Sequence, residues 1–434
     1  MLLPKYLDNT ALMQEILIDR QSLAEILGFE RFTELSLARK MAPSPERVLE
    51  FLAELGSRTR PVALEDMRAI HAFARDTLDI ETVEPWDLAF CAEGLKRQRF
   101  ALSDEDIRPY FPATKVLKGL FEIVRRLFDV NIEQTTDVTV WHSDVTTYVI
   151  KRDDEVIARF YLDLYARAKK RGGAWMADCR CRRRHPLHGL TLPVAFLTCN
   201  FIPPVGDKPS LLTHDDVVTL FHECGHGLHH LLTQVDEPAV AGINGVPWDA
   251  VELPSQFLEN WCWERESLNL FAKHHETGEN IPDDLFAKMI KARHFFQRNT
   301  TMRQMAFSKL DLFLHRKWAK GDLQNLESSL QVELDGYLPK RKTTPRSIVL
   351  RFSHLFSSPT GYASAYYSYK WAEVLDADAF TRFKKEGVMN GQTGREFREK
   401  ILSQGNAFPP DELFRSFMGR DPNTKALLER SGLA

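Results

Sequence analysis

Two histidines and a glutamate between them form the part of the sequence best suited to chemistry. His222 and His226 are four residues apart, so on a helix they lie one above the other on one face and can bind one metal ion. Glu223 is rotated away from that face, where it cannot join the imidazoles as a ligand but can take a proton from a water held beside the metal. The spacing therefore predicts a metal site with a general base next to it.

The residues around this motif carry the signals of a helix. Thr213 followed by Asp216 is typical of a helix start, because a Thr oxygen and a first-turn carboxylate can accept from unpaired N–H groups. Apolar residues then recur at spacings of three and four, at Val217, Phe221, Cys224, Leu228 and Leu231. A His-Glu-x-x-His string also arises by chance, so a third ligand has to decide.

Glu252 is the candidate for that third ligand. Pro254 lacks an N–H and is tolerated only in the first turn of a helix, so a second helix must begin close to Glu252. Glu259 follows seven residues later on the same face and suits a partner that orients a ligand imidazole. A solvated polar face is the alternative, which stays open for Glu259, whereas for Glu252 we favour the ligand.

Together the two motifs resemble the thimet oligopeptidase family of zinc peptidases. The resemblance rests on His-Glu-Cys-Gly-His-Gly-Leu-His-His from His222 onward and on Gly-Val-Pro-Trp-Asp-Ala-Val-Glu-Leu-Pro-Ser-Gln-Phe-Leu-Glu-Asn-Trp-Cys-Trp up to Trp263. It implies a zincin-like HExxH metallopeptidase region in which Glu223 is the catalytic base and short peptides are the substrates. It also implies that one zinc ion per chain is bound by His222, His226 and Glu252.

A second stretch, rich in tyrosine, offers hydrogen-bond donors. Tyr362, Tyr366, Tyr367 and Tyr369 lie within eight residues, beside a glycine-containing loop. Phenolic O–H groups can donate to the oxyanion that forms when water attacks a peptide carbonyl. Packing at a helix start is the alternative, which we prefer for Tyr367. The family resemblance implies that the site is lined by His354, Tyr362, Tyr366 and Tyr369, so these four are the candidates.

The sequence departs from the family pattern in two ways. Relatives usually have a Gly-Gly pair before the first tyrosine, whereas residues 357–361 here form a longer loop, so the pose of Tyr362 and His354 can differ. Full-length relatives also carry a long helical region upstream of what is Met1 here. We therefore expect a chain that binds zinc, hydrolyses peptides poorly, and self-associates or needs a partner that supplies the N-terminal region. The alternative function is a truncated or split zinc-binding paralogue that acts in peptide binding or partner association.

Composition narrows the class of protein. The chain has 434 residues, 44% of them hydrophobic, which allows a large core, and its formal net charge of -3 gives no reason to expect nucleic acid as a partner. No basic segment followed by a long apolar one opens the sequence, and no later run approaches a membrane span, so we expect a cytoplasmic protein without a membrane partner. The six cysteines show no disulfide framework, and Cys179 and Cys181 are expected in a solvated basic loop.

Periodicity predicts a mainly α-helical protein with a small β-sheet. Residues 1–135 are predicted to be a helical scaffold, in which new helices follow Pro61, Pro85 and Pro112. Residues 136–434 are predicted to form the catalytic region. Its parts are a small sheet at about 140–200, metal helices at about 213–265, the tyrosine-rich loop at 352–371, and C-terminal helices. The family resemblance gives the sheet an edge on which an extended peptide adds as a strand.

Overall fold

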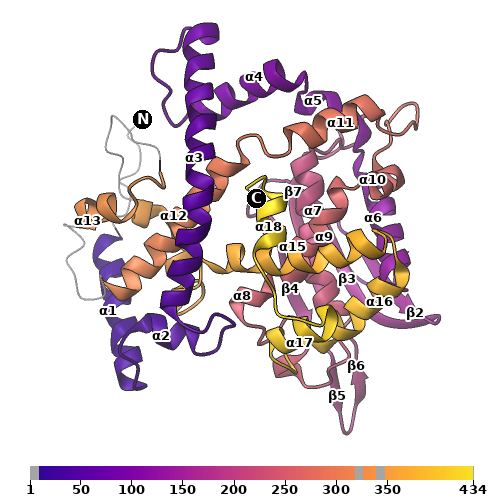
Figure 1. Cartoon of the computed structure of the whole chain (residues 1–434). Coiled ribbons are helices and arrows are strands. Elements are labelled where there is room, and N and C mark those ends of the chain that lie inside the picture. Colours follow the sequence, from indigo (N-terminus) through magenta and orange to yellow (C-terminus); the bar gives the residue numbers. More distant parts are fainter. Residues whose placement is uncertain (1–8, 318–325, 339–347, 434) are drawn as a thin grey trace. The chain divides into compact units, whose positions relative to one another are not determined.

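The computed structural model describes residues 9–317, 326–338 and 348–433, and the chain divides into two compact units (Figure 1). Unit 1 comprises Met1–Leu95, His294–Trp371 and Leu433. Unit 2 comprises Lys96–Arg293, Ala372–Gly432 and Ala434. Both units join segments that are far apart in the sequence. The parts of the predicted regions at residues 1–8, 318–325, 339–347 and 434 lie outside the described residues.

Unit 1 contains helices and no strand among its described residues. Its helices are α1 (Thr10–Ile26), α2 (Phe32–Leu37), α3 (Pro45–Leu78), α12 (Gln297–Arg316), α13 (Leu326–Glu333), a 3-10 turn (Ile348–Arg351) and α14 (Ser353–Phe356). α15 (Ser368–Glu386) begins in unit 1 and continues into unit 2, and α4 (Leu88–Phe100) also spans the boundary. Buried apolar residues from α1, α12 and α13, such as Leu17, Leu310 and Leu330, form one core with Tyr366.

The prediction that a new helix begins after Pro61 is wrong, because α3 runs through that residue. A proline inside a helix removes one N–H, which leaves the carbonyl of the residue four positions earlier without its partner. That residue is Ser57, and both Ser57 and Pro61 are exposed, so water can satisfy the carbonyl. The buried side of the helix, with Leu52 and Leu55, continues without interruption to Ile70. The predicted helices after Pro85 and Pro112 are confirmed as α4 and α6 (Ala113–Phe128).

Unit 2 contains a five-stranded sheet in the order β1-β2-β3-β7-β4. β3 and β7 are parallel, and the other neighbouring strands are antiparallel. The strands are β1 (Asn131–Thr135), β2 (Thr146–Arg152), β3 (Glu155–Tyr165), β7 (Val194–Phe201) and β4 (Trp175–Arg180). The strands predicted near β2, β3 and β7 are confirmed. Asp153 and Asp154 both have positive φ angles, 50° and 64°, which suits the two-residue turn between β2 and β3.

The sequence led us to expect a solvated basic loop around Cys179 and Cys181, but part of this segment forms strands. Cys179 is the fifth residue of β4, and β5 (Arg183–His185) pairs with β6 (Gly189–Thr191) in a separate hairpin. Asp236 accepts from both Arg182 and Arg184 at 2.8 Å, which offsets the positive charge of the hairpin. The charges of these two arginines are therefore balanced by Asp236, which lies more than 50 residues later in the sequence.

Two helices lie on the same face of the sheet, α6 (Ala113–Phe128) and α7 (His214–Leu231) (Figure 1). Phe121 of α6 contacts Phe160 of β3, with ring centroids 6.3 Å apart. Gly227 of α7 lies against Leu197 of β7, since a Cβ added to this glycine would lie 2.9 Å from Leu197 Cδ2. Because Leu162 is opposite Leu197 in the register and two residues from Phe160, these side chains project from one face. The sheet therefore packs directly against α7, the helix that carries the motif.

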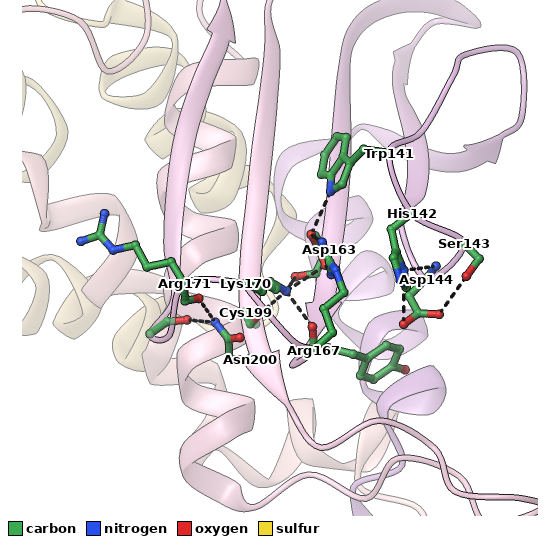
Figure 2. A network of polar contacts seen from close by, with 12 residues as sticks. Trp141, His142, Ser143, Asp144, Asp163, Arg167, Lys170, Arg171, Cys199 and Asn200 are labelled. Atoms are coloured by element: carbon green, nitrogen blue, oxygen red, sulfur yellow. Dashed lines mark hydrogen bonds and ion pairs between the residues drawn. The ribbon is translucent and has the colours of Figure 1, made fainter.

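A buried ion-pair network joins the C-terminal ends of β3 and β7, as Figure 2 shows. Lys170 Nζ lies 2.8 Å from Asp163 Oδ1, 2.8 Å from the carbonyl oxygen of Tyr165 and 2.5 Å from that of Cys199 in β7. Burial favours the protonated form of Asp163, but hydrogen bonds from Arg167 and Lys170 outweigh it and lower the pKa of Asp163 to about 2. The network fixes the end of β7, from which the chain continues toward α7.

The remaining helices of unit 2 complete a mainly helical fold with a small sheet, which confirms the predicted fold class. They include α5 (Asp104–Ile107), α8 (Trp248–Val251), α9 (Leu253–Glu259), α10 (Arg265–Phe271), α11 (Asp283–Ala292), α16 (Gly391–Lys400), α17 (Pro410–Met418) and α18 (Lys425–Arg430). Phe257 of α9 stacks on Phe397 of α16 with centroids 4.0 Å apart, which anchors α9 in the core. None of the described helices has the length and apolar character needed to cross a membrane.

Candidate metal centre

The helix α7 carries His222, Glu223 and His226, and it begins as the sequence predicts. Thr213 Oγ1 accepts from the N–H of Asp216 at 3.1 Å, and Asp216 Oδ2 accepts from the N–H of Thr213 at 2.9 Å. These reciprocal hydrogen bonds satisfy N–H groups that a helix start would otherwise leave unpaired. The start of the motif helix is therefore fixed by its own sequence.

Glu252 lies at the junction of α8 and α9, directly before the first residue of α9. Pro254 lies in the first turn of α9, as the sequence predicts. Gly225 allows α7 to approach this junction closely, because a Cβ at that position would lie 2.4 Å from the carbonyl oxygen of Pro254. Ser255 Oγ donates to Glu252 Oε2 at 2.9 Å and holds the carboxylate in place. A glycine inside the motif helix is the sequence signal from which this close approach could have been predicted.

Ligand atoms of the three predicted metal residues converge. Glu252 Oε2 lies 3.2 Å from His222 Nε2 and 3.1 Å from His226 Nε2. All three ligand atoms lie within 4.8 Å of one another. Ligand atoms of a tetrahedral zinc site with bonds of about 2.0–2.1 Å are about 3.3 Å apart, so the donor set and the two His–Glu distances fit such an ion. Among the described residues, no other group of three His, Cys, Asp or Glu converges in this way.

Glu259 orients one of the imidazoles. Its Oε1 lies 2.7 Å from His222 Nδ1, so the opposite ring nitrogen, Nε2, is directed toward Glu252. This arrangement supports the role of an orienting partner over that of a solvated surface carboxylate. The Nδ1 atom of His226 has no hydrogen-bond partner within the described residues. The two imidazoles are thus held differently, because among the described residues a carboxylate contacts the Nδ1 atom of His222 and none contacts that of His226.

Without a metal, protons compete for the same atoms. Burial lowers the pKa of His222, but hydrogen bonds to Glu252 and Glu259 outweigh it and leave the pKa well above the usual range. Burial would raise the pKa of Glu252, yet the charges and hydrogen bonds of His226 and His222 hold it far below its ordinary value. The carboxylate is therefore ionised, as a metal ligand must be, and binding of a cation would displace protons from the imidazoles.

Glu223 is nearly buried beside the ligand group, with 6% of its surface exposed. Burial raises the pKa of this carboxyl group, whereas the neighbouring His222 and His226 lower it. Its Oε2 atom has no hydrogen-bond partner within the described residues. A desolvated carboxylate with a raised pKa and a spare acceptor atom can take up a proton and release it again.

The four predicted residues of the second stretch form an aromatic cluster in unit 1. The hydroxyl oxygens of Tyr362 and Tyr369 lie 2.6 Å apart, and their rings are stacked with centroids 5.7 Å apart. His354 lies 5.4 Å from Tyr362 and 5.6 Å from Tyr366, measured between ring centroids. Tyr367 is fully buried and meets Trp371 edge-on, in keeping with the packing role preferred for it.

Two polar groups of this cluster, Tyr366 and His354, have pKa values shifted by burial. Burial raises the pKa of Tyr366 to about 12, so its hydroxyl keeps its proton and can donate a hydrogen bond. Burial also lowers the pKa of His354, which leaves the imidazole neutral. The structure thus brings His222, Glu223, His226 and Glu252 together in unit 2. It gathers the other four predicted residues in unit 1.

Two packed helices that present a partly buried His-His-Glu group beside a small sheet define a zincin-like HExxH protein. The chain belongs to peptidase family M3, whose family model matches residues 3–433.

Relatives of this family match most of the chain. Oligopeptidase A of Salmonella typhimurium is 46% identical over 428 residues, which cover 98% of this chain and 62% of the relative. Oligopeptidase A of Escherichia coli is 45% identical over 431 residues, with the same coverage of 98% and 62%. The chain therefore spans about three fifths of the length of these curated relatives.

Solved structures show the same fold at much lower identity. A structure of PZ peptidase A with inhibitor 2 matches with a TM-score of 0.58 at 15% identity, covering 98% of this chain and 64% of that one. The structure of Pyrococcus furiosus carboxypeptidase matches with a TM-score of 0.57 at 14% identity, covering 98% and 73%. At these identities the likeness concerns the fold alone.

Proposed function

We propose that the chain is a zinc-dependent endopeptidase that hydrolyses short peptides, with one zinc ion held by His222, His226 and Glu252. The observation that carries the proposal is the convergence of these ligand atoms beside the buried Glu223. When bound, zinc supplies a Lewis acid that polarises a carbonyl and lowers the pKa of water. The family and the names of the relatives, which include oligopeptidase A and dipeptidyl carboxypeptidase, support a peptidase.

Glu223 serves as the general base in this proposal. Its carboxylate accepts a proton from the attacking water and later gives that proton to the leaving amine. The raised pKa of Glu223 makes the carboxylate a better base than an exposed glutamate, and its burial excludes competing solvent. General-base contributions are typically about a hundred- to ten-thousand-fold in rate.

Tyr366, Tyr369 or His354 stabilises the oxyanion, and Tyr362 lines the same cluster. A tyrosine with a pKa of about 12 remains a donor through the reaction, and a hydrogen bond to a developing negative charge strengthens as that charge forms. The 2.6 Å contact between the Tyr362 and Tyr369 hydroxyls supports a shared polar role, because either O–H can polarise the other.

The edge strand β4 is the proposed binding site for the extended peptide. It occupies one end of the sheet order and pairs only with β7 among the described strands. β4 packs against α7, the helix that carries Glu223, which supports this placement. A peptide added to this edge would gain main-chain hydrogen bonds next to the proposed metal ligands.

A cytoplasmic location of the protein and its association with a partner stay predictions.

The test is peptide turnover by the full chain loaded with zinc. We expect one zinc ion per chain by elemental analysis and cleavage of internal bonds in a short peptide. A chelator should remove both the zinc and the turnover, and added zinc should restore them. A chain that binds one zinc ion without any turnover would contradict the proposal and favour peptide binding or partner association instead. Light scattering in the same buffer gives the oligomeric state.

A further inference from the structure

Asp311 of α12 is a fully buried carboxylate that binds the backbone of the tyrosine-rich segment. Its Oδ1 accepts from the N–H of Ser364 at 2.8 Å, and its Oδ2 accepts from the N–H groups of Ala365 and Tyr366, both at 2.9 Å. The side chain is 0% exposed. Three consecutive N–H groups thus converge on one carboxylate inside unit 1, immediately beside a tyrosine of the cluster.

The backbone at this point needs such support. Ser364 has a φ angle of 54°, a left-handed conformation that residues other than glycine seldom adopt. The segment is buried, so its N–H groups cannot turn to solvent for partners. A carboxylate satisfies three of them together and stabilises a conformation that the local sequence alone would not favour.

His315, one turn later on α12, extends this contact. Its Nδ1 lies 2.9 Å from the backbone carbonyl oxygen of Asp311 and 3.0 Å from Asp311 Oδ1, and its Nε2 lies 3.1 Å from the NH1 nitrogen of Arg20 in α1. Because a guanidinium only donates, Nε2 is the acceptor, and Nδ1 carries the proton that it donates to the backbone carbonyl of Asp311, close to the carboxylate. Arg20, His315 and Asp311 therefore form one directed chain of buried hydrogen bonds.

Arg20 binds the other end of the same segment. Its NH2 nitrogen donates to the carbonyl oxygens of Leu355 at 2.6 Å and Ser358 at 3.0 Å, and its Nε donates to that of Pro359 at 2.9 Å. Burial lowers the pKa of Arg20 to about 10, and the charge of Asp311 opposes this, so the side chain stays charged near pH 7. Carbonyls at the start of the segment and N–H groups at its end are thus held by connected side chains.

We propose that Asp311, connected through His315 to Arg20, is a positioning residue that holds both ends of the segment from Leu355 to Tyr366 and thereby fixes the pose of Tyr362 and Tyr366. The proposal rests on the role of the tyrosines proposed above. Asp311 touches no reacting atom in this account, and it acts only through the backbone that carries the tyrosines. Its loss should therefore change kcat through misplaced donors while leaving the metal ligands intact.

The test is Asp311→Asn in the full zinc-loaded chain. The amide places a donor where a carboxylate oxygen accepted, so at least one of the three N–H groups loses its partner. We expect kcat to fall about ten- to a hundred-fold, with KM within about three-fold, since misplacement by about 1 Å costs on this scale. Zinc content should stay at one per chain, and hydrogen exchange of the amides at 364–366 should become fast.

Asp378→Asn is the matched control. Asp378 is also a buried carboxylate, 1% exposed, that binds an arginine, Arg420, and the backbone N–H of Asn423 at 3.1 Å, but it belongs to unit 2. We expect this variant to lose thermal stability while its kcat and the exchange at 364–366 stay as in the parent. An equal fall of kcat in both variants would mean a general loss of stability and would overturn the positioning role.

Arg20→Lys keeps the charge but not the three-carbonyl contact, so it provides a second variant if Asp311→Asn does not fold. A smaller fall of kcat with faster exchange at 364–366 supports the proposal, and parental kcat with parental exchange overturns it. Tyr366→Phe and Tyr369→Phe are measured in parallel. If they lower kcat and Asp311→Asn does not, only this inference fails, whereas parental kcat in both Phe variants overturns the proposed role of the tyrosines and this inference with it.

Discussion

The metal centre and the tyrosine cluster are built in opposite ways. The proposed metal ligands lie on α7 and at the residue that precedes α9, and the starts of both helices are set by their own residues, Thr213 with Asp216 and Pro254. The tyrosine cluster depends on contacts that span the chain, because Asp311 binds residues 53 to 55 positions later and Arg20 binds residues more than 330 positions later. One region is therefore specified locally and the other by buried long-range polar contacts.

This difference predicts how substitutions separate the two properties. Changes in the α7 and α9 motifs should remove metal binding without disturbing the tyrosine segment. Changes in the buried polar chain of unit 1 should alter turnover while zinc content stays constant.

The largest expected effect is loss of the metal from His226→Ala. Removing one of three protein ligands leaves an incomplete set, so zinc content should fall from one per chain to nearly none after dialysis. Elemental analysis measures it directly. His275→Ala removes a partly buried histidine of the same unit outside the cluster and should keep one zinc. Undiminished zinc in His226→Ala would refute the ligand assignment.

The next effect concerns kcat in Tyr366→Phe and Tyr369→Phe. An oxyanion donor acts mainly in the transition state, so removing one should lower kcat by about a hundred- to a thousand-fold with little change in KM. Tyr367→Phe is the control, because Tyr367 is fully buried against Trp371. Small and equal effects at all three positions would favour packing over catalysis, and zinc content should be parental in each variant.

A smaller effect is expected for Glu259→Gln. The amide can still contact His222 Nδ1 but without the negative charge that the 2.7 Å contact now provides. Loss of such an orienting partner typically weakens metal binding by about ten- to a hundred-fold. Competition with a chromophoric chelator gives the zinc Kd of both proteins. An unchanged Kd would mean that Glu259 is a bystander.

The pH dependence of zinc binding should follow the same contact. The pKa of His222 lies well above its usual range in the metal-free protein, so zinc must displace a proton below that pKa and its affinity should rise with pH. The expected slope is up to about ten-fold per pH unit for each proton released. Because Glu259 helps to raise this pKa, Glu259→Gln should shift the rise to lower pH. A Kd of the parent that does not change between about pH 5 and 8, the range in which histidines usually titrate, would contradict this.

The sequence predicted what local patterns encode. The capping residues, the apolar stripe of α7 and the alternation that runs through β3 all act within one element, and all three are present in the structure. β1 (Asn131–Thr135) was not predicted because it has a single apolar residue, Ile132, and β4 because its second half is exposed at the sheet edge. Alternating burial did not mark either strand.

The remainder depended on tertiary contacts. The passage of α3 through Pro61 followed from an uninterrupted buried side, which outweighs one missing hydrogen bond. Nothing in the residues next to Asp311 marks it as a binding partner for Ser364, Ala365 and Tyr366, because a single buried carboxylate has no periodic signature. Gly225 was a sequence sign that α7 packs closely against another element. The spacing of Glu259 from Glu252 predicted its position on the same helix face, but not whether it orients an imidazole or faces solvent.

The central claim is that His222, His226 and Glu252 bind a zinc ion while Glu223 acts as base without being a ligand. Glu223→Gln tests it most directly, because the amide has nearly the same shape as the carboxylate but cannot accept the proton. Zinc content and peptide turnover should be measured on one preparation. The account predicts one zinc per chain and turnover reduced by about a hundred- to ten-thousand-fold. Turnover near that of the parent, or loss of zinc from the variant, would contradict it.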